Sequence, residues 1–363
     1  MQDISMTISK RFIILSVIAL IAVGIYANQT LIMRQLLPTA ATRVIQFDVI
    51  SDLGEGLHVA LCGAGGPMPS DNRSGPCVAV IANSEMFIID VGVGGSSNLA
   101  RMGLNRGTIE AVFLTHFHSD HIGGLGELAM NRWVAGSHTS PLTVHGPSGV
   151  SEVVAGFNQA YAQDSVHRYD HHGNSVANLS GSGLVASSHQ VPELGQKTMV
   201  YDKSGLTVEM FAVDHQPISP AVGYLFTFKG RTVLISGDTT KSANIELFSK
   251  QVDLLVHEAL SNELLSVMSQ SAERAGNSPL SKIFHDVLDY HTSPTEVAEI
   301  ARDADVGHLL YYHIVPPLDI PGLEGIWLDG VDDIFTKYTL GVDGTMFTLP
   351  GNSTEIIKVD SRM

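Results

Sequence analysis

One short segment carries four side chains that can ligate a metal. It reads Thr-His-Phe-His-Ser-Asp-His, and His116 and His118 stand two positions apart, so both leave the end of a strand on the same side. Asp120 and His121 follow in the turn that leads to a pair of glycines, where the backbone can approach a bound group closely. Imidazole nitrogens and carboxylate oxygens both suit Zn²⁺. Because four groups of one loop cannot complete the coordination of two adjacent cations, we expect further ligands elsewhere in the chain.

Three other residues are candidates for these further ligands. His215, Asp238 and His313 each follow a short apolar run, and the carboxylate of Asp238 can bridge two metal ions. Single histidines elsewhere fit an ordinary core or surface role, and we expect no ligand among His58, His138, His145, His167, His171, His172, His189, His285 and His308.

The candidate ligands require strands that end at one edge of a sheet. Short apolar runs rich in β-branched or aromatic residues indicate buried strands over residues 86–89, 111–114, 233–235, 252–256 and 309–312. Helices are expected between them, over residues 151–163, 263–275 and 294–304. Ser293, Pro294 and Glu296 form a capping box at the start of the last helix. This alternation predicts a layered α/β domain in which polar residues at several strand ends converge on one rim.

The N-terminal segment differs from the rest of the chain. Lys10 and Arg11 precede an apolar run over residues 12–27, which favours an uncleaved membrane anchor over a cleaved signal peptide. A basic flank stays on the cytoplasmic side, so the remainder is expected to be periplasmic or otherwise extracytoplasmic, either membrane-anchored or secreted. We therefore divide the chain into an N-terminal segment, residues 1–40, and one large domain, residues 41–363. Within that domain, residues 164–196 have the composition of an inserted loop.

The composition limits the class of protein. Lys and Arg total 21 and Asp and Glu total 37, which gives a net charge of −16, and 16% of the residues are charged. The chain is too apolar for intrinsic disorder, and two cysteines are too few for a disulfide scaffold. A negative chain repels phosphate backbones, which argues against general binding of nucleic acid. Cys62 and Cys77 can either pair with each other or remain two small apolar residues.

The order of the candidate ligands resembles that of the metallo-β-lactamase superfamily, over about residues 47 to 340, with Asp90 as the first motif. The resemblance implies an α/β fold built as a four-layer αββα sandwich, with a dinuclear zinc site along one edge. It implies one zinc held by His116, His118 and His215, a second held by Asp120, His121 and His313, and Asp238 as the bridge. Manganese or iron suits the same ligand set.

Other motifs indicate a branch of that superfamily. The loops at residues 63–76 and 146–149 resemble those of the arylsulfatase-like and ribonuclease Z-like branch. The sequence Val-His-Glu-Ala that contains Glu258 resembles the HEAT motif of ribonuclease Z, and Tyr-His-Thr-Ser around His291 resembles its histidine motif. The resemblance implies that Glu258 and His291 deliver a proton to the leaving group, while Asp120 orients the attacking water. The alternative for Glu258 and His291 is a buried ion pair without a catalytic role.

These features predict a dinuclear zinc hydrolase that cleaves an anionic ester, either a phosphodiester or an aryl sulfate, by attack of a hydroxide held between the metals. The alternatives are a lactonase or β-lactamase that acts on a cyclic carbonyl, tRNA 3′ processing of the ribonuclease Z type, and a non-catalytic metal-binding module. Ribonuclease Z carries a tRNA-binding arm between its third and fourth motifs, and the short gap between His215 and Asp238 leaves no room for one. We therefore expect a small anionic ester as substrate and no nucleic acid as partner. A membrane contact through the N-terminal segment and a homodimer complete the expected partners.

Overall fold

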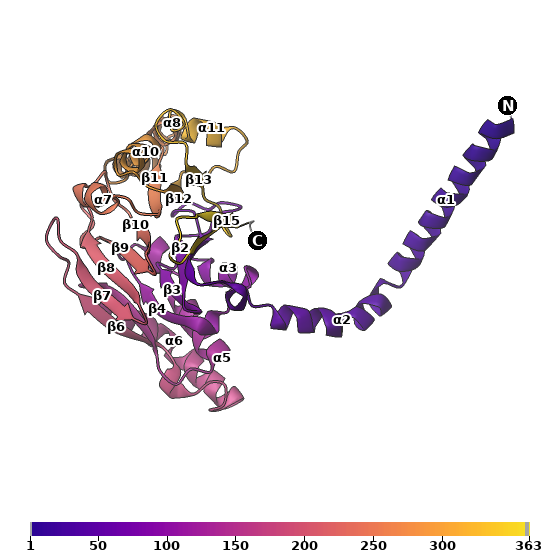
Figure 1. Ribbon diagram of the computed structural model, residues 1–363, viewed down its shortest axis with the longest axis horizontal. Coiled ribbons are helices and arrows are strands. Elements are labelled where there is room, and N and C mark those ends of the chain that lie inside the picture. Colours follow the sequence, from indigo (N-terminus) through magenta and orange to yellow (C-terminus); the bar gives the residue numbers. More distant parts are fainter. Residues whose placement is uncertain (1, 360–362) are drawn as a thin grey trace. The chain divides into compact units, whose positions relative to one another are not determined.

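The computed structural model describes residues 2–359 and 363, and its contacts divide the chain after Asp48. The N-terminal unit consists of α1 (Gln2–Ala27) and α2 (Gln29–Gln46), which meet at Asn28 with a bend of 70° (Figure 1). Among the described residues no single helix is long and apolar enough to cross a membrane, whereas residues 12–27 and 29–46 together have the length and composition of a broken span. Membrane attachment of this segment stays a prediction.

The second unit begins at Val49 and contains two β-sheets that pack face to face. The first sheet has the order β15-β14-β1-β2-β3-β4-β5-β6. Its strands are β1 (Gly56–Gly63), β2 (Cys77–Ala82), β3 (Glu85–Ile89), β4 (Ile109–Phe113), β5 (Leu142–Pro147), β6 (Leu184–His189), β14 (Met346–Pro350) and β15 (Ile357–Val359). The second sheet has the order β13-β12-β11-β10-β9-β8-β7. Its strands are β7 (Thr198–Lys203), β8 (Leu206–Ala212), β9 (Val222–Phe228), β10 (Arg231–Ile235), β11 (Leu254–Leu260), β12 (His308–Val315) and β13 (Tyr338–Leu340).

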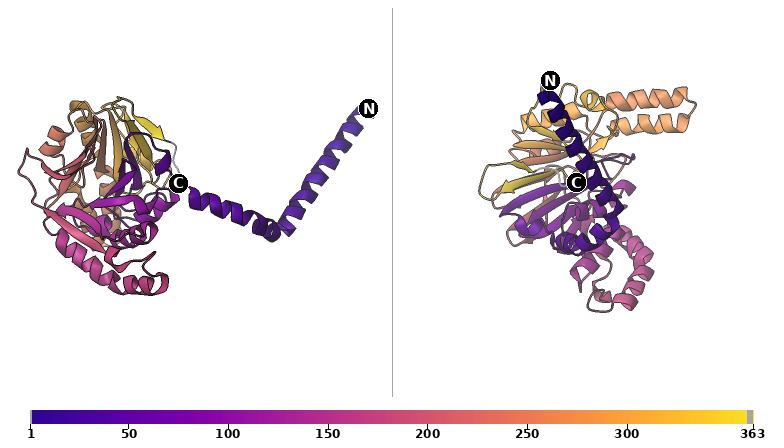
Figure 2. Two further views of the ribbon diagram at one scale, coloured as in Figure 1. Left: turned by 60° about the horizontal axis from the view of Figure 1, so that its bottom comes forward. Right: turned by 90° about the vertical axis from the view of Figure 1, so that its right-hand side faces the viewer.

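Apolar side chains of both sheets form the central core. Phe113 of β4 and Phe226 of β9 illustrate the contact, because their ring centroids lie 5.6 Å apart and both side chains are fully buried. Two further clusters lie on the outer faces, where helices cover each sheet. The first sheet is covered by α3 (Gly95–Arg101), α5 (Leu125–Gly136) and α6 (Val150–His172), and the second by α7 (Ala243–Phe248), α8 (Asn262–Arg274), α10 (Pro294–Asp303) and α11 (Leu323–Trp327). The expected αββα sandwich is confirmed (Figure 2).

The predicted strands that precede the ligands are all present, and they run parallel on each side of the site. β3 pairs in parallel with β4 and β4 with β5, while β10, β11 and β12 are parallel in the second sheet. The capping box of α10 is also confirmed. Ser293 Oγ lies 3.4 Å from the backbone nitrogen of Glu296. In return, Oε2 of Glu296 accepts a hydrogen bond of 3.0 Å from the backbone nitrogen of Ser293. Parallel strands bring their carboxyl ends to a common edge, which is where the polar residues collect.

One expected loop is largely regular structure. The helix predicted over residues 151–163 continues to His172, and β6 occupies part of the same stretch of 164–196. Only Val150 and Val154 of α6 are buried, so its later turns have no apolar face from which a helix could be predicted. An ion pair of 2.7 Å between Arg168 and Asp164, four residues apart, stabilises these exposed turns.

Two strands continue beyond the residues at which the sequence predicted their ends. β11 continues through Glu258 to Leu260, and β12 continues through His313 to Val315. The two strands are paired along this extension, so the functional side chains there project from sheet and not from a loop. The apolar runs that marked these strands ended earlier because a polar side chain that faces the site interrupts the apolar pattern.

Candidate functional site

The loop between β4 and α4 (Ser119–Ile122) is held by Asp90 at the end of β3. Asp90 Oδ1 accepts a hydrogen bond of 2.8 Å from the backbone nitrogen of Thr115, and its Oδ2 accepts one of 2.7 Å from Thr115 Oγ1. The same Oδ2 lies 2.8 Å from Nδ1 of His121, which therefore donates its proton there. Asp90 thus fixes both the path of the loop and the ring of His121, with Nε2 left free to bind.

The loop reaches across to the second sheet. The backbone oxygen of Thr115 accepts a hydrogen bond from Val222 at the start of β9, and the hydroxyl of Tyr224 donates a bond of 2.7 Å to the oxygen of Leu114. A Cβ atom on Gly237 would lie 2.8 Å from the Val222 oxygen, so only glycine fits beside this contact. Ligands that follow strands of different sheets are thereby brought to one place.

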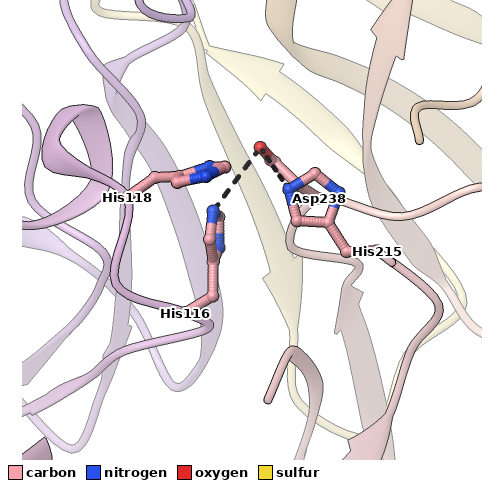
Figure 3. A group of neighbouring side chains, drawn as sticks. All are labelled: His116, His118, His215 and Asp238. Carbon is pink, nitrogen blue, oxygen red and sulfur yellow. Dashed lines mark ion pairs between the residues drawn. The ribbon is translucent and has the colours of Figure 1, made fainter. Parts of the chain in front are cut away.

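His215 and Asp238 come from loops of the second sheet. His215 follows β8, and its Nδ1 donates a hydrogen bond of 2.8 Å to the backbone oxygen of Tyr290. Asp238 follows β10, and only 2% of its surface is exposed. The bond to Tyr290 fixes the tautomer of His215 and directs its Nε2 toward Asp238 (Figure 3).

His313 is the extra residue of a β-bulge in β12. Glu258 of β11 pairs with Tyr312 and Ala259 with Ile314, so His313 has no partner in β11. Its φ of 45° lies in the left-handed region, which is uncommon for a residue other than glycine. A bulge turns a side chain out of its regular alternation, and here it brings the imidazole into the cluster of ligands.

The structure brings all seven predicted ligands together. His116, His118, His215 and Asp238 form one group and Asp120, His121 and His313 a second, and within each group the ligand atoms lie within 4.8 Å of one another. Asp238 Oδ2 lies between the groups, because it is 3.2 Å from Nε2 of both His121 and His313 in the second group. In the first group it is 3.8 Å from His116 and 3.9 Å from His215 (Figure 3). Asp120 Oδ2 lies 3.6 Å from His121 and 3.4 Å from His313.

The free atoms of this cluster fit a cation. Nε2 of each of four histidines is buried without a hydrogen-bond partner among the described residues, and so is Oδ1 of Asp238; the histidines are His116, His121, His215 and His313. Buried polar atoms are normally paired, because leaving them unpaired costs free energy. A set of imidazole nitrogens and carboxylate oxygens suits zinc, manganese or iron. The cluster therefore has the composition and the unmet bonding of a metal site.

The charges within the cluster add to the effect of burial on the pKa of His116 and oppose it at His121 and Asp238. Burial lowers the pKa of His116 well below its usual value, and the imidazole of His121 lowers it further. Burial also acts to lower the pKa of His121, but the carboxylates of Asp238 and Asp90 outweigh it and raise that pKa well above the usual value. Burial acts to raise the pKa of Asp238, yet His121 and His313 hold it well below the usual range. The carboxylate that lies between the groups is thus ionised.

Glu258 and His291 adjoin the ligands. The carboxylate oxygen Oε1 of Glu258 lies 3.1 Å from Nδ1 of His291, and it also accepts backbone hydrogen bonds from Thr239 and Thr292. Glu258 is fully buried. His291 itself lies within 4.8 Å of Asp238 and His313, measured between ligand atoms. Glu258 is therefore fixed beside the cluster with its carboxylate facing His291. The role of the two residues in proton delivery stays a prediction.

A cavity of about 290 Å³ opens onto Asp120, His291 and His313. Its apolar lining includes Leu265 of α8 and Ile283 and Phe284 of α9 (Ser278–Asp286), which no sequence motif connected with the site. The signal was present in the sequence. Apolar residues follow the helical spacing of three and four at Leu280, Ile283, Phe284, Val287 and Leu288.

A glycine-rich loop, residues 63–76, packs against the bulged His313. Cys62 and Cys77 at the ends of this loop form a disulfide, which decides between the two alternatives left open by the sequence. Asp343 accepts hydrogen bonds from the backbone nitrogens of Ala64 and Ser74 and so closes the loop a second time. A Cβ atom on Gly66 would lie 3.1 Å from Cε1 of His313, so the loop backbone lies directly on the imidazole.

Comparisons with known proteins agree with this geometry. The family model of the metallo-beta-lactamase superfamily matches residues 71–285. Ribonuclease Z of Mycobacterium sp. (strain KMS) is 32% identical over 272 residues, which cover 75% of this chain and 88% of that protein. Ribonuclease Z of Mycobacterium bovis (strain BCG / Pasteur 1173P2) is 31% identical over 275 residues, which cover 75% of this chain and 90% of that protein.

Solved structures share the fold at lower identity. The metallo-beta-lactamase fold protein YhfI of Bacillus subtilis superimposes with a TM-score of 0.58 at 18% identity and covers 81% of this chain and all of that one. The short form of human tRNase Z has a TM-score of 0.58 at 19% identity, and the match covers 81% of this chain and 99% of that one. At such identities the likeness shows the fold alone.

The expectation about substrate and partner is wrong. The name Ribonuclease Z says that these relatives act on RNA. This finding overturns both the exclusion of nucleic acid and the expectation of a small anionic ester as substrate. The net charge of −16 misled because it describes the whole surface. Two cations in a site would be the largest local charges there and would supply positive charge where a phosphate binds. The short gap between His215 and Asp238 describes one segment and does not exclude other contacts to RNA.

Proposed function

This chain belongs to the metallo-β-lactamase superfamily and to its ribonuclease Z-like branch, and from that membership we propose that it is a two-metal phosphodiesterase that cleaves RNA. One observation carries the proposal. The carboxylate of Asp238 lies 3.2 Å from the free Nε2 atoms of both His121 and His313, between two groups of ligand-type side chains. The name of the relatives supports a phosphodiester of RNA over an aryl sulfate or a cyclic carbonyl.

The two groups of side chains support a division of the proposed ligands between two cations. His116, His118 and His215 would hold one cation, Asp120, His121 and His313 the other, and Asp238 would contact both. Zinc is the proposed metal, and the same nitrogen and oxygen donors accept manganese or iron. When bound, such a pair of cations lowers the pKa of a water molecule and neutralises charge on the phosphate.

The chain's own residues position the reaction. Asp120 lines the cavity and lies beside the ligands, so its carboxylate can orient the attacking water and accept its proton. His291 lines the same cavity and would donate a proton to the oxygen that leaves phosphorus. Glu258 is fixed by two backbone N–H groups, and its Oε1 lies 3.1 Å from Nδ1 of His291, so it would act as the positioning residue.

An extracytoplasmic location belongs to the same proposal. Disulfides persist in oxidising compartments, and the pairing of Cys62 with Cys77 supports such a compartment. The apolar run over residues 12–27 behind Lys10 and Arg11 supports it independently. Cell fractionation, with thiol labelling of the denatured protein before and after reduction, tests this. Two freely labelled cysteines in the soluble cytoplasmic fraction would contradict it.

The test of the function uses the full-length chain, loaded with zinc or manganese and quantified for metal. We expect turnover of bis(p-nitrophenyl) phosphate and of an RNA with a 3′ extension, and none of p-nitrophenyl sulfate. Asp120→Asn should abolish both activities, whereas Asp214→Asn, an exposed carboxylate beside the site, should retain them. Hydrolysis of a lactone or a β-lactam without turnover of either phosphodiester would reject the proposal in favour of a carbonyl substrate.

A further inference from the structure

Two helices form a hairpin that stands beside the site. α8 ends at Arg274, α9 begins at Ser278, and Ser269 Oγ of the first helix donates a hydrogen bond of 2.9 Å to the backbone oxygen of Ser281 in the second. Figure 2 shows this pair of helices side by side, projecting from the rest of the domain in its right-hand view. In the chain the hairpin lies between Glu258 and His291, so it joins the two members of the proposed proton-delivery pair.

The hairpin supplies an apolar wall to the cavity of about 290 Å³. Leu265 of α8 and Ile283 and Phe284 of α9 line the cavity, and Met68 of the glycine-rich loop also lines it. Ile283 is 56% exposed, which is high for an isoleucine at the mouth of a site. No lysine or arginine is among the described residues that line this cavity. This wall therefore suits an uncharged, flat or apolar group and offers nothing to a phosphate.

A second cavity, of about 690 Å³, meets the first at the site. The two share Pro67, Met68, Ser119 and Asp120, but His291 lines only the first. A phosphodiester carries two substituents on its phosphorus. With the phosphorus beside Asp120, one substituent can enter each cavity. Because His291 is the proposed proton donor to the leaving oxygen, the cavity that it lines belongs to the leaving-group side.

We infer that the apolar cavity beside the hairpin binds a nucleobase of the substrate on the leaving-group side of the scissile phosphate. The inference rests on the proposed function and adds the substrate group that this wall recognises. A nucleobase has apolar faces that pack on such side chains whatever its sequence identity. Purines should bind more tightly than pyrimidines, because they bury more apolar area.

The test measures binding of uncharged nucleosides to the full-length, metal-loaded chain, so it needs neither a phosphate nor turnover. We expect adenosine and guanosine to bind more tightly than cytidine and uridine, by calorimetry or ligand-observed NMR. Ile283→Asp should weaken adenosine binding at least tenfold. Val267→Asp is the matched control, because Val267 lies on the same hairpin, is also 56% exposed and does not line the cavity. Both side chains are more than half exposed, so thermal unfolding should show that both variants fold.

The outcomes separate this inference from the proposed function. Turnover of bis(p-nitrophenyl) phosphate without nucleoside binding overturns the inference and leaves the function standing. Nucleoside binding that Ile283→Asp weakens, in a chain that turns over no phosphodiester, supports the base site and overturns the function. Equal binding to both aspartate variants places the nucleosides elsewhere and overturns the inference.

Discussion

Oδ2 of Asp238 lies 3.2 Å from Nε2 of His313, and the two residues come from the loop after β10 and from a bulge in β12 of the same sheet. The same oxygen is 3.2 Å from Nε2 of His121, which belongs to the other sheet. A single carboxylate thus connects the two halves of the sandwich. Its removal should disturb both groups of ligands at once.

The first prediction concerns metal content. Asp238→Asn should reduce bound zinc well below the level of the unaltered chain and lower phosphodiesterase activity at least a hundredfold, because the amide cannot supply a charged oxygen to both groups. Elemental analysis after gel filtration measures the metal. Asp214→Asn serves as the control, since Asp214 is exposed and should leave the metal content unchanged. Full metal content in Asp238→Asn would contradict the assignment.

The second prediction concerns the contact between Gly66 and His313. A Cβ atom at position 66 would lie 2.8 Å from Cγ2 of Val315 and 3.1 Å from Cε1 of His313, so Gly66→Ala must displace the imidazole or the loop. We expect zinc affinity to fall about tenfold in a chelator competition. Gly156→Ala is the control, because nothing lies within 4 Å of its added Cβ in the exposed helix α6. It should keep the affinity and stabilise the fold by up to about 1 kcal/mol.

The third prediction concerns the pH dependence of stability. Burial, together with the neighbouring His189, lowers the pKa of His145 to about 4, and its Nδ1 lies 3.0 Å from Nε2 of His189. In the unfolded chain a histidine titrates near ~6.5. The unfolded state therefore binds more protons below that pH, and stability due to neutral His145 is present above it and lost as the pH falls toward 4.

The size of this effect can be measured by denaturant unfolding of the chelator-treated protein. His145 should contribute a loss of up to about 3 kcal/mol between pH 6.5 and pH 4. His145→Phe should show a smaller loss over the same interval, because a phenyl ring can stack on Phe113 as the imidazole does, without a proton to bind. An identical pH dependence in both proteins would show that His145 does not titrate in this way.

The fourth prediction concerns the disulfide. Cys62 and Cys77 stand 15 positions apart in sequence, and for a loop of this size chain entropy gives a stabilisation of roughly 3 kcal/mol. The double variant Cys62→Ser, Cys77→Ser should therefore unfold at a lower denaturant concentration. A reductant should destabilise the unaltered chain by a similar amount and leave the double variant unchanged. A reductant effect that persists in the double variant would point to another cause.

The fifth prediction separates proton delivery from metal binding. His291→Ala should retain zinc but slow turnover, most for phosphodiesters with poor leaving groups and least for nitrophenyl esters, because a good leaving group needs no proton. Glu258→Gln should give the same pattern to a smaller extent, since it acts through His291. His285→Ala, an exposed histidine on the neighbouring helix, is the control. Equal losses for good and poor leaving groups would remove His291 from this role.

The parts of the site that lie close together in the chain could be predicted from residue types alone. The spacing of His116, His118, Asp120 and His121 already indicates a metal, because four such side chains within six residues cannot all face solvent without crowding. His215 and His313 became candidates because each follows an apolar run, and the resemblance to a family then gave each of them a place in a ligand set. The left-handed bulge at His313 left no trace in the sequence, because it depends on how β11 and β12 are paired.

The predictions that were wrong or missing failed for other physical reasons. The exposed end of α6 lacks an apolar face, and helix prediction depends on one. The apolar spacing of α9 was visible, but only the folded chain shows that Ile283 and Phe284 line the site. The exclusion of RNA came from the total charge, which does not describe the local field around two bound cations, and from the short gap between His215 and Asp238, which describes one segment only.

The hairpin leaves and re-enters the domain at two points that are joined to each other. The backbone nitrogen of Leu260 donates a hydrogen bond of 2.9 Å to the oxygen of Thr292, and Glu258 Oε1 accepts one from the nitrogen of Thr292. The hairpin itself, residues 262–286, can therefore change in length and sequence without moving the ligands, provided that Tyr290 and His291 after it are kept. Exchange of this one segment between homologues would be expected to transfer substrate preference while the chemistry stays the same.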